Sequence, residues 1–195
     1  MRDDAAFTEF VDRHRNSLIN YLTHLTRSRE RGEELAQESF VRFYRSGWQT
    51  RADEQLAPYL FRIGTNLSVT LVRRERRWQR LLPSLTARHP QSAPPADRPL
   101  LAEEIQQQVR GALDRLPVKF RAPLVLFEME EWSYEQIATA LGCRIGTVKS
   151  RISRARAQMR TLLESWWIGG NHERCGTWQR AAATAASDGA ASIHV

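Results

Sequence analysis

The sequence predicts an all-α protein with two small helical domains, the second of which contains a helix-turn-helix. Apolar residues recur at spacings of three and four along most of the chain, which is the period of an amphipathic helix and not of a strand. Five prolines lie within residues 82–99, where no apolar period exists. A turn at Gly142 then has the sequence spacing of a DNA-binding helix pair.

These observations divide the chain into four predicted segments. Residues 1–80 form the first helical domain, and residues 81–100 form a flexible, Pro-rich linker, extended enough to hold the two domains apart. Residues 101–165 form the helix-turn-helix domain. Residues 166–195 are rich in Gly, Ala and Ser and are predicted to be disordered.

The first domain is predicted to contain three helices. The first ends before residues 28–32, the second runs from about residue 33 to 44, and residues 46–57 form a polar loop. The third begins with Pro58 in its first turn, where a missing N–H costs little. The apolar stripes of the first and third helices are Phe7, Phe10, Val11, His14, Leu18, Tyr21, Leu22 and Leu25, and Tyr59, Leu60, Ile63, Leu67 and Leu71.

The helix-turn-helix follows from short-range signals. Ser133 and Gln136 form a capping-box pattern, which predicts a helix from residue 133 to 141. Gly142 follows the small Ala138 by four residues and supplies the positive φ that the turn needs. Val148 comes six residues later and faces the core. The residues predicted to complete the apolar packing are Ile137, Leu141, Ile145 and Ile152.

The next helix, predicted over residues 147–163, has a basic outer face. That face contains Lys149, Ser150, Ser153 and Arg154, with Arg151, Arg156 and Arg160 beside them. Such side chains reach base edges in the major groove and hold phosphates. The chain has 29 Lys and Arg against 22 Asp and Glu, a net charge of +7 that suits a polyanion. A solvated basic face would look the same, so the preceding turn carries the prediction of DNA binding.

Other classes of function find little support. The two cysteines, Cys143 and Cys175, are far apart in the sequence and have neither zinc-ligand nor disulfide spacing. This cysteine usage fits the reducing cytoplasm. Cys143, directly after the turn glycine, is predicted to be a buried core thiol. The five histidines are scattered, and no hydrolase, metalloprotease or P-loop motif occurs. No apolar run is long enough for membrane insertion. The protein is therefore predicted not to be an enzyme and to need no cofactor or metal.

Three stretches narrow the DNA-binding prediction to a family. Residues 33–45 (EELAQESFVRFYR) and residues 58–77 (PYLFRIGTNLSVTLVRRERR) resemble the polymerase-binding and promoter-melting helices of sigma factors. Residues 116–160 resemble their second DNA-binding domain. The order and the Pro-rich linker are those of the extracytoplasmic-function (ECF) group. The resemblance implies that residues 1–80 correspond to sigma region 2 and residues 101–165 to region 4.

The resemblance also implies three sets of site residues. The set that binds core RNA polymerase is Glu33, Glu34, Gln37, Glu38, Arg42 and Arg45. The set that meets the −10 element is Trp48, Arg62, Asn66, Arg73, Arg74, Arg76 and Arg77. The set that reads the −35 element is Thr147, Lys149, Ser150, Arg151, Ser153, Arg154 and Arg156. Trp48 has two open interpretations, because it either offers a face to a flipped base or folds onto the core.

The implied function is promoter-specific transcription initiation in the bacterial cytoplasm, in a stress or envelope response. The implied partners are promoter DNA and core RNA polymerase, which would be contacted at its β′ clamp coiled coil and its β flap. A further implied partner is an anti-sigma factor that holds the two domains closed. The family often has a proline where this chain has Arg144, which adds a candidate phosphate contact. The alternative is another helix-turn-helix regulator that is not a polymerase subunit.

Overall fold

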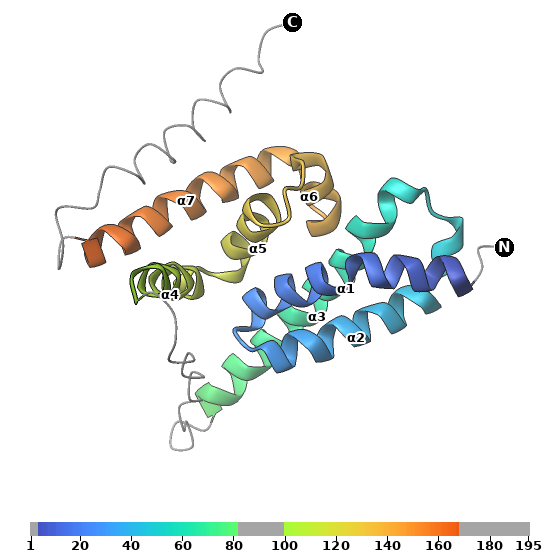
Figure 1. The fold of residues 1–195 in the computed structure, drawn as a ribbon, viewed down its shortest axis with the longest axis horizontal. Coiled ribbons are helices and arrows are strands. Elements are labelled where there is room, and N and C mark those ends of the chain that lie inside the picture. Colours follow the sequence, from blue (N-terminus) through green and yellow to red (C-terminus); the bar gives the residue numbers. More distant parts are fainter. Residues whose placement is uncertain (1–3, 82–99, 168–195) are drawn as a thin grey trace, which may run out of the picture.

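The computed structural model describes residues 4–81 and 100–167, and each regular element in these two ranges is a helix, as predicted. Figure 1 shows the two halves side by side. The first half contains α1 (Asp4–Thr26), α2 (Arg29–Arg45), a 3-10 turn η1 (Trp48–Thr50) and α3 (Asp53–Leu81). The second half contains α4 (Leu100–Arg115), α5 (Val118–Glu128), α6 (Tyr134–Leu141) and α7 (Ile145–Trp167). The predicted linker and tail lie almost entirely outside the described residues.

The apolar stripe of α1 is the centre of the first half. Leu18, Tyr21, Leu22 and Leu25 are fully buried against α2 and α3, as the periodicity predicted. Gly32 lets α2 cross α1 closely, because a Cβ added there would lie 2.8 Å from the backbone nitrogen of Thr23.

Two helix boundaries in this half differ from the prediction. The second helix begins at Arg29, because the Ser28 hydroxyl accepts a hydrogen bond from the Arg31 backbone N–H and caps it. The third helix begins at Asp53, so Pro58 lies inside α3 and not at its first turn. Pro58 is the sixth residue of α3, past the four positions whose N–H groups have no intrahelical partner, so it removes one intrahelical hydrogen bond. The polar loop is therefore shorter than expected.

The second half contains the predicted helix-turn-helix, formed by α6 and α7. Ser133 and Gln136 make both hydrogen bonds of the capping box. Gly142 has a φ of 59°, the left-handed conformation that ends α6. Val148 is fully buried, as predicted. Ile145 was expected in the core but is 39% exposed, at the first residue of α7.

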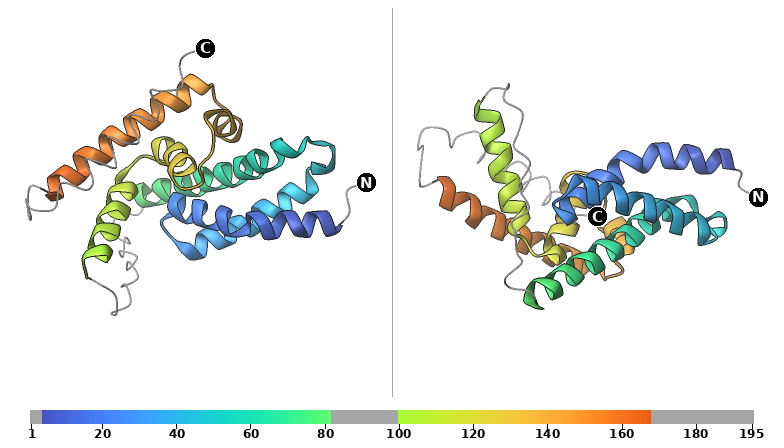
Figure 2. Two further views of the ribbon diagram at one scale, coloured as in Figure 1. Left: turned by 45° about the horizontal axis from the view of Figure 1, so that its top comes forward. Right: turned by 90° about the horizontal axis from the view of Figure 1, so that it is seen from below.

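The two halves contact each other directly. Helix α3 packs against α6, and the end of α1 packs against α5 (Figure 2). The sequence predicted domains held apart, and the described residues differ from that expectation. The reason is that side chains of α1 and α3 pack against those of α5 and α6. The composition of the linker does not predict such packing between the domains.

Candidate nucleic-acid interface

The outer face of α7 is built as the sequence predicts. Lys149, Ser150, Ser153 and Arg154 are exposed, while the opposite side of the helix buries Val148, Ile152 and Ala155 against α5 and α6. The helix-turn-helix packing therefore orients a polar, cationic strip outwards. A strip of this kind fits the edges and phosphates of a DNA major groove.

The flanking residues of α7 are held more tightly. Arg156 pairs with Glu128 at 2.7 Å, and its guanidinium lies 5.1 Å from the centre of the Phe127 ring. Arg151 and Thr147 are partly buried, with the Arg151 Nη1 atom 3.9 Å from the Cys143 sulfur. Cys143 itself is partly buried and packs against the core. These contacts hold Arg151 and Arg156 against the rest of the domain, whereas Arg154 is exposed and is a candidate base contact.

A second cationic surface runs along α3. Arg62, Asn66, Arg73 and Arg77 are exposed and are separated by four, seven and four residues, which places them on one helix face. Arg74 is exposed beside them, and the Arg76 side chain lies outside the described structure. The opposite side of α3 buries Leu60, Phe61, Thr65 and Ser68. A row of arginines at this spacing can follow a phosphate backbone.

Trp48 is a core residue in this structure. Its side chain is 2% exposed, and its ring centre lies 5.8 Å from that of Phe7 and 5.9 Å from that of Phe43. Of the two interpretations that the sequence left open, packing onto the core describes this position. As placed, the indole presents no accessible face on which a base could stack.

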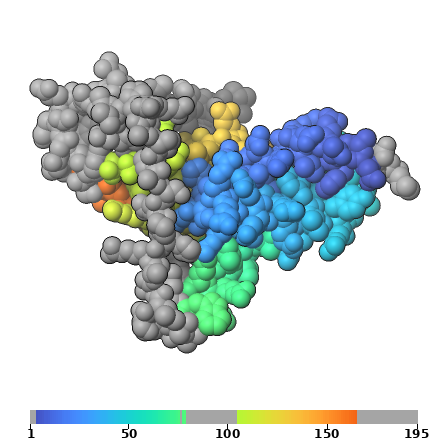
Figure 3. All heavy atoms as spheres, turned by 60° about the horizontal axis from the view of Figure 1, so that its bottom comes forward, coloured from blue at the N-terminus to red at the C-terminus, as the bar shows by residue number. Residues whose placement is uncertain are grey.

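The outer face of α2 carries the third predicted set. All six of its residues are exposed, and Figure 3 shows α2 open to solvent on this side of the molecule. Glu33 pairs with Arg29 at 2.9 Å and Glu38 with Arg42 at 2.6 Å, both at a spacing of four residues. Pairs of this exposed kind contribute about 0.3–0.5 kcal/mol each. The face is of mixed charge, with three glutamates opposed by Arg29, Arg42 and Arg45.

Sequence reasoning missed two apolar members of that face. Val41 and Tyr44 are 39% and 43% exposed on α2, and the Tyr44 hydroxyl donates a hydrogen bond to Asp4 at 3.0 Å. The period of α2 could have revealed them, because Phe40 and Phe43 occupy the buried side and leave positions 41 and 44 outside. Apolar side chains among charges are typical of protein-contact surfaces.

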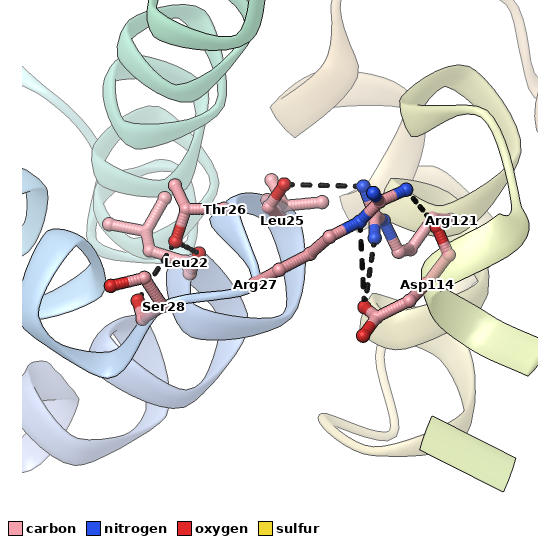
Figure 4. A network of polar contacts seen from close by, with 7 residues as sticks. All are labelled: Leu22, Leu25, Thr26, Arg27, Ser28, Asp114 and Arg121. Carbon is pink, nitrogen blue, oxygen red and sulfur yellow. Dashed lines mark hydrogen bonds and ion pairs between the residues drawn. The ribbon is translucent and has the colours of Figure 1, made fainter. Parts of the chain in front are cut away.

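Sequence reasoning also missed a buried arginine between the halves. Arg121 on α5 is 2% exposed, and its Nη1 atom lies 3.2 Å from the Asp114 carboxylate. Its Nη2 atom donates to the Leu25 carbonyl at 3.3 Å (Figure 4). The only sequence signal is an arginine inside the apolar run of residues 120–127.

Burial shifts the pKa of two ionisable groups near the contact between the halves. Burial, and then the charge of Arg110, lowers the pKa of His24 below its ordinary value. Burial raises the pKa of Glu130, which accepts a hydrogen bond from Ser17 of α1. Within residues 4–81 and 100–167, no group of three or more His, Cys, Asp and Glu could hold a metal ion. No helix in those ranges has the length and apolarity needed to cross a bilayer.

The comparisons with known proteins agree with this geometry. The model of sigma-70 region 2 matches residues 10–78, and the model of sigma-70 region 4 matches residues 106–159. The chain is 30% identical over 172 residues to the RNA polymerase sigma-H factor of Pseudomonas aeruginosa, covering 83% of this chain and 88% of that protein. This chain belongs to the ECF group of the sigma-70 family. Members of the family are non-catalytic initiation factors that bind core RNA polymerase and promoter DNA and direct promoter-specific transcription.

Further relatives give the same family. The ECF sigma factor SigE of Mycolicibacterium smegmatis is 35% identical over 159 residues, which cover 81% of this chain and 62% of that longer protein. The solved structure of the sigma factor RpoE with the anti-sigma factor NepR from Bartonella quintana has a TM-score of 0.64 at 25% identity, covering 81% of this chain and 96% of that one. The structure of CnrH with the cytosolic domain of CnrY has a TM-score of 0.60 at 23% identity and supports the fold.

Proposed function

We propose that this sigma factor uses three separate faces in the bacterial cytoplasm: α2 for core polymerase, α3 for the −10 element and α7 for the −35 element. The observation that carries the proposal is that one chain presents a helix face of paired glutamates and arginines and two cationic helix faces, in the family's order, on three helices. We also propose that the protein is not an enzyme and needs no cofactor. Residues 1–80 and 101–165 are the proposed working domains.

The −35 assignment is supported by exposure and charge on α7. Lys149, Ser150, Ser153 and Arg154 are the proposed base-reading residues, and Thr147, Arg151 and Arg156 support them from the same helix. A bidentate contact from an arginine to guanine contributes roughly 1–3 kcal/mol of discrimination against the wrong base. Arg154 is the proposed residue for such a contact because it is exposed, whereas Arg151 and Arg156 are partly buried.

The −10 assignment is supported by the row on α3. Arg62, Arg73 and Arg77 share one face with Asn66, so the arginines can hold phosphates while the amide meets a base edge. Arg74 and Arg76 belong to the same cationic segment of the sequence. The proposal assigns Trp48 no direct contact with a base, because it is buried.

The polymerase assignment is supported by the composition of the α2 face. Four of its side chains are Glu or Gln and two are Arg, a pattern that complements a basic helical surface such as the β′ clamp coiled coil. Val41 and Tyr44 would add apolar contact area in the middle of that interface. The proposed contact of region 4 is the β flap, and an anti-sigma factor is a proposed regulator, as in the RpoE–NepR structure.

The test is run-off transcription with core polymerase and genomic fragments. We expect promoter-specific transcripts, which Glu34→Lys on α2 and Arg154→Ala on α7 should each reduce. Pull-down of core polymerase separates the two variants, since only Glu34→Lys should weaken it. Glu9→Lys, an equal charge reversal at an exposed position on α1, is the matched control. If wild-type protein bound DNA but never core polymerase, the chain would act as an independent helix-turn-helix regulator and the proposal would be wrong.

A further inference from the structure

The last turns of α3 carry a large apolar side chain that the proposed function does not use. Trp78 is 54% exposed, whereas Trp48 is 2% exposed and Trp132 is partly buried against the core. One exposed apolar residue is ordinary on a protein surface, so the neighbours of Trp78 decide whether its ring has a role.

The neighbours of Trp78 on the helix surface are arginines. Arg73, Arg74 and Arg77 are exposed, and the period of the helix places Trp78 beside Arg74, at the edge of the arginine row. Surfaces that bind nucleic acids use this combination of side chains. The arginines hold phosphates, and an aromatic ring stacks on an unpaired base or an apolar side chain inserts at a base step.

The one carboxylate near these arginines is neutralised. Glu75 is the only acidic residue in residues 55–81, and it forms an ion pair with Arg31 near the start of α2. The side chains of Arg31 and Glu75 are 31% and 33% exposed, so the pair lies partly inside the contact between α2 and α3. It therefore holds this end of α3 in place. It also keeps the negative charge on the side of the helix opposite Arg77, because two residues span about 200° of helical rotation.

The end of α3 is open to a partner along its length. Figure 3 shows this end, in green, projecting past α2. Trp78 lies twelve residues after Asn66, and a helix rises about 1.5 Å per residue, so the two positions are roughly 18 Å apart along α3. Duplex DNA rises about 3.4 Å per base pair, so this separation corresponds to roughly five base pairs.

An anionic membrane surface would also attract arginines and an indole. The arginine row favours DNA, because it continues along the same helix to Asn66 and Arg62. A nucleic acid accounts for both ends of this row, since an amide meets base edges while arginines hold phosphates. A lipid surface accounts only for the end at Trp78.

We propose that Trp78, with Arg74 and Arg77, forms a second promoter contact roughly five base pairs upstream of the base that Asn66 meets. The upstream direction follows because the chain leaves α3 at this end towards the helix-turn-helix that is proposed to read the −35 element. The contact does not depend on base sequence, since every base offers the same kind of face to an indole. This inference rests on the proposed role of α3 at the −10 element.

The test measures the affinity of the holoenzyme for two promoter fragments that both lack the −35 element. The reference point is the −10 base whose substitution weakens binding of the wild type most. The short fragment ends about three base pairs upstream of that base, and the long fragment extends about nine base pairs upstream. The added segment is prepared both as a duplex and as the non-template strand alone. Trp78→Ala is compared with Trp78→Phe, which keeps a ring, and with Met129→Ala, which removes an apolar side chain that is 55% exposed in the other domain.

We expect Trp78→Ala to raise the Kd for the long fragment by about fivefold or more and to leave the Kd for the short fragment unchanged. Trp78→Phe should recover most of the loss, and Met129→Ala should match the wild type. A loss on the duplex form indicates insertion at a base step, and a loss on the single strand indicates stacking on an unpaired base. Either result supports the contact.

Equal losses on the two fragments, or no loss on the long fragment, would overturn the proposal. An unchanged Kd for DNA with a lower Tm would mean that the ring packs on another part of the chain. An unchanged Kd for DNA with weaker binding to phosphatidylglycerol vesicles would mean a lipid contact. Asn66→Ala separates this inference from the proposed function. If Asn66→Ala had no effect while Trp78→Ala weakened binding of the long fragment alone, the −10 assignment of α3 would fail and the contact at Trp78 would stand.

Discussion

Substitution of Trp48 by alanine distinguishes a core role from a base-binding role. The indole is 2% exposed and packs against the rings of both Phe7 and Phe43, so its removal leaves a cavity where η1 follows α2. Trp→Ala changes in cores cost about 3–5 kcal/mol. In a domain of this size each kcal/mol lowers Tm by about 4–8 °C, so the first domain should melt at least roughly 12 °C lower.

The assay is thermal unfolding of the full chain, followed by circular dichroism. The conservative variant Trp48→Phe keeps an aromatic ring in the cavity and should recover much of the lost stability. A base-stacking residue on the surface would behave differently, because its removal would impair promoter melting at nearly unchanged Tm. A Trp48→Ala loss below about 1 kcal/mol, combined with lost open-complex formation, would refute the argument from burial.

Three more predictions follow from single contacts. Gly32→Ala should destabilise the protein by about 1–3 kcal/mol in urea unfolding, since the new Cβ would lie 2.8 Å from the Thr23 nitrogen. In the control variant Gly111→Ala the new Cβ meets nothing within 4 Å, so this substitution should stabilise the protein by about 0.5–1 kcal/mol. Equal effects of the two substitutions would contradict the close crossing of α1 and α2. Arg154→Ala should weaken promoter binding by about 1–3 kcal/mol, concentrated at one −35 base pair in a mutant-promoter series, and an equal loss on random DNA would make it a phosphate contact. The pKa of His24 is lowered from 6.5 by burial, so protonation of this side chain opposes folding. Its contribution to the free energy of unfolding is complete above about pH 6.5 and is lost as the pH falls below about 6.5. The free energy of unfolding should therefore differ less between about pH 7.5 and about pH 5.5 in His24→Gln than in the wild type.

Local signals in the sequence predicted the helix-turn-helix well. The capping box at Ser133, the left-handed turn at Gly142 and the burial of Val148 all depend on residues close together in the chain. The apolar stripe of α1 was equally clear, because the period of a long amphipathic helix outweighs any single residue. Exposure of the three predicted faces follows from the same periodicity.

The errors arose where competing local signals had to be weighed. Ser28 is a good N-cap, yet the nearby Gly32 suggested a break, and the structure uses both by capping at Ser28 and crossing closely at Gly32. Pro58 was expected at a helix start, but Asp53 and Glu54 offer an acidic first turn that begins α3 earlier. Neither choice changes which face of its helix is exposed, so the predicted surfaces survive the shifted boundaries.

The contact between the domains was beyond local reasoning for a different cause. Arg121 and the Leu25 carbonyl are 96 residues apart, and nothing near either residue indicates the other. Pro-rich composition in residues 82–99 limits how the linker can fold, but it sets no preference between open and closed domains. That preference depends on the free energy of the interface, to which Phe61, Arg121 and Glu130 contribute. An arginine inside an apolar helix is therefore a more useful signal of a domain contact than the composition of the linker. Burial of the arginine's charge requires hydrogen-bond acceptors, and a domain that cannot supply enough of them must find them on its neighbour.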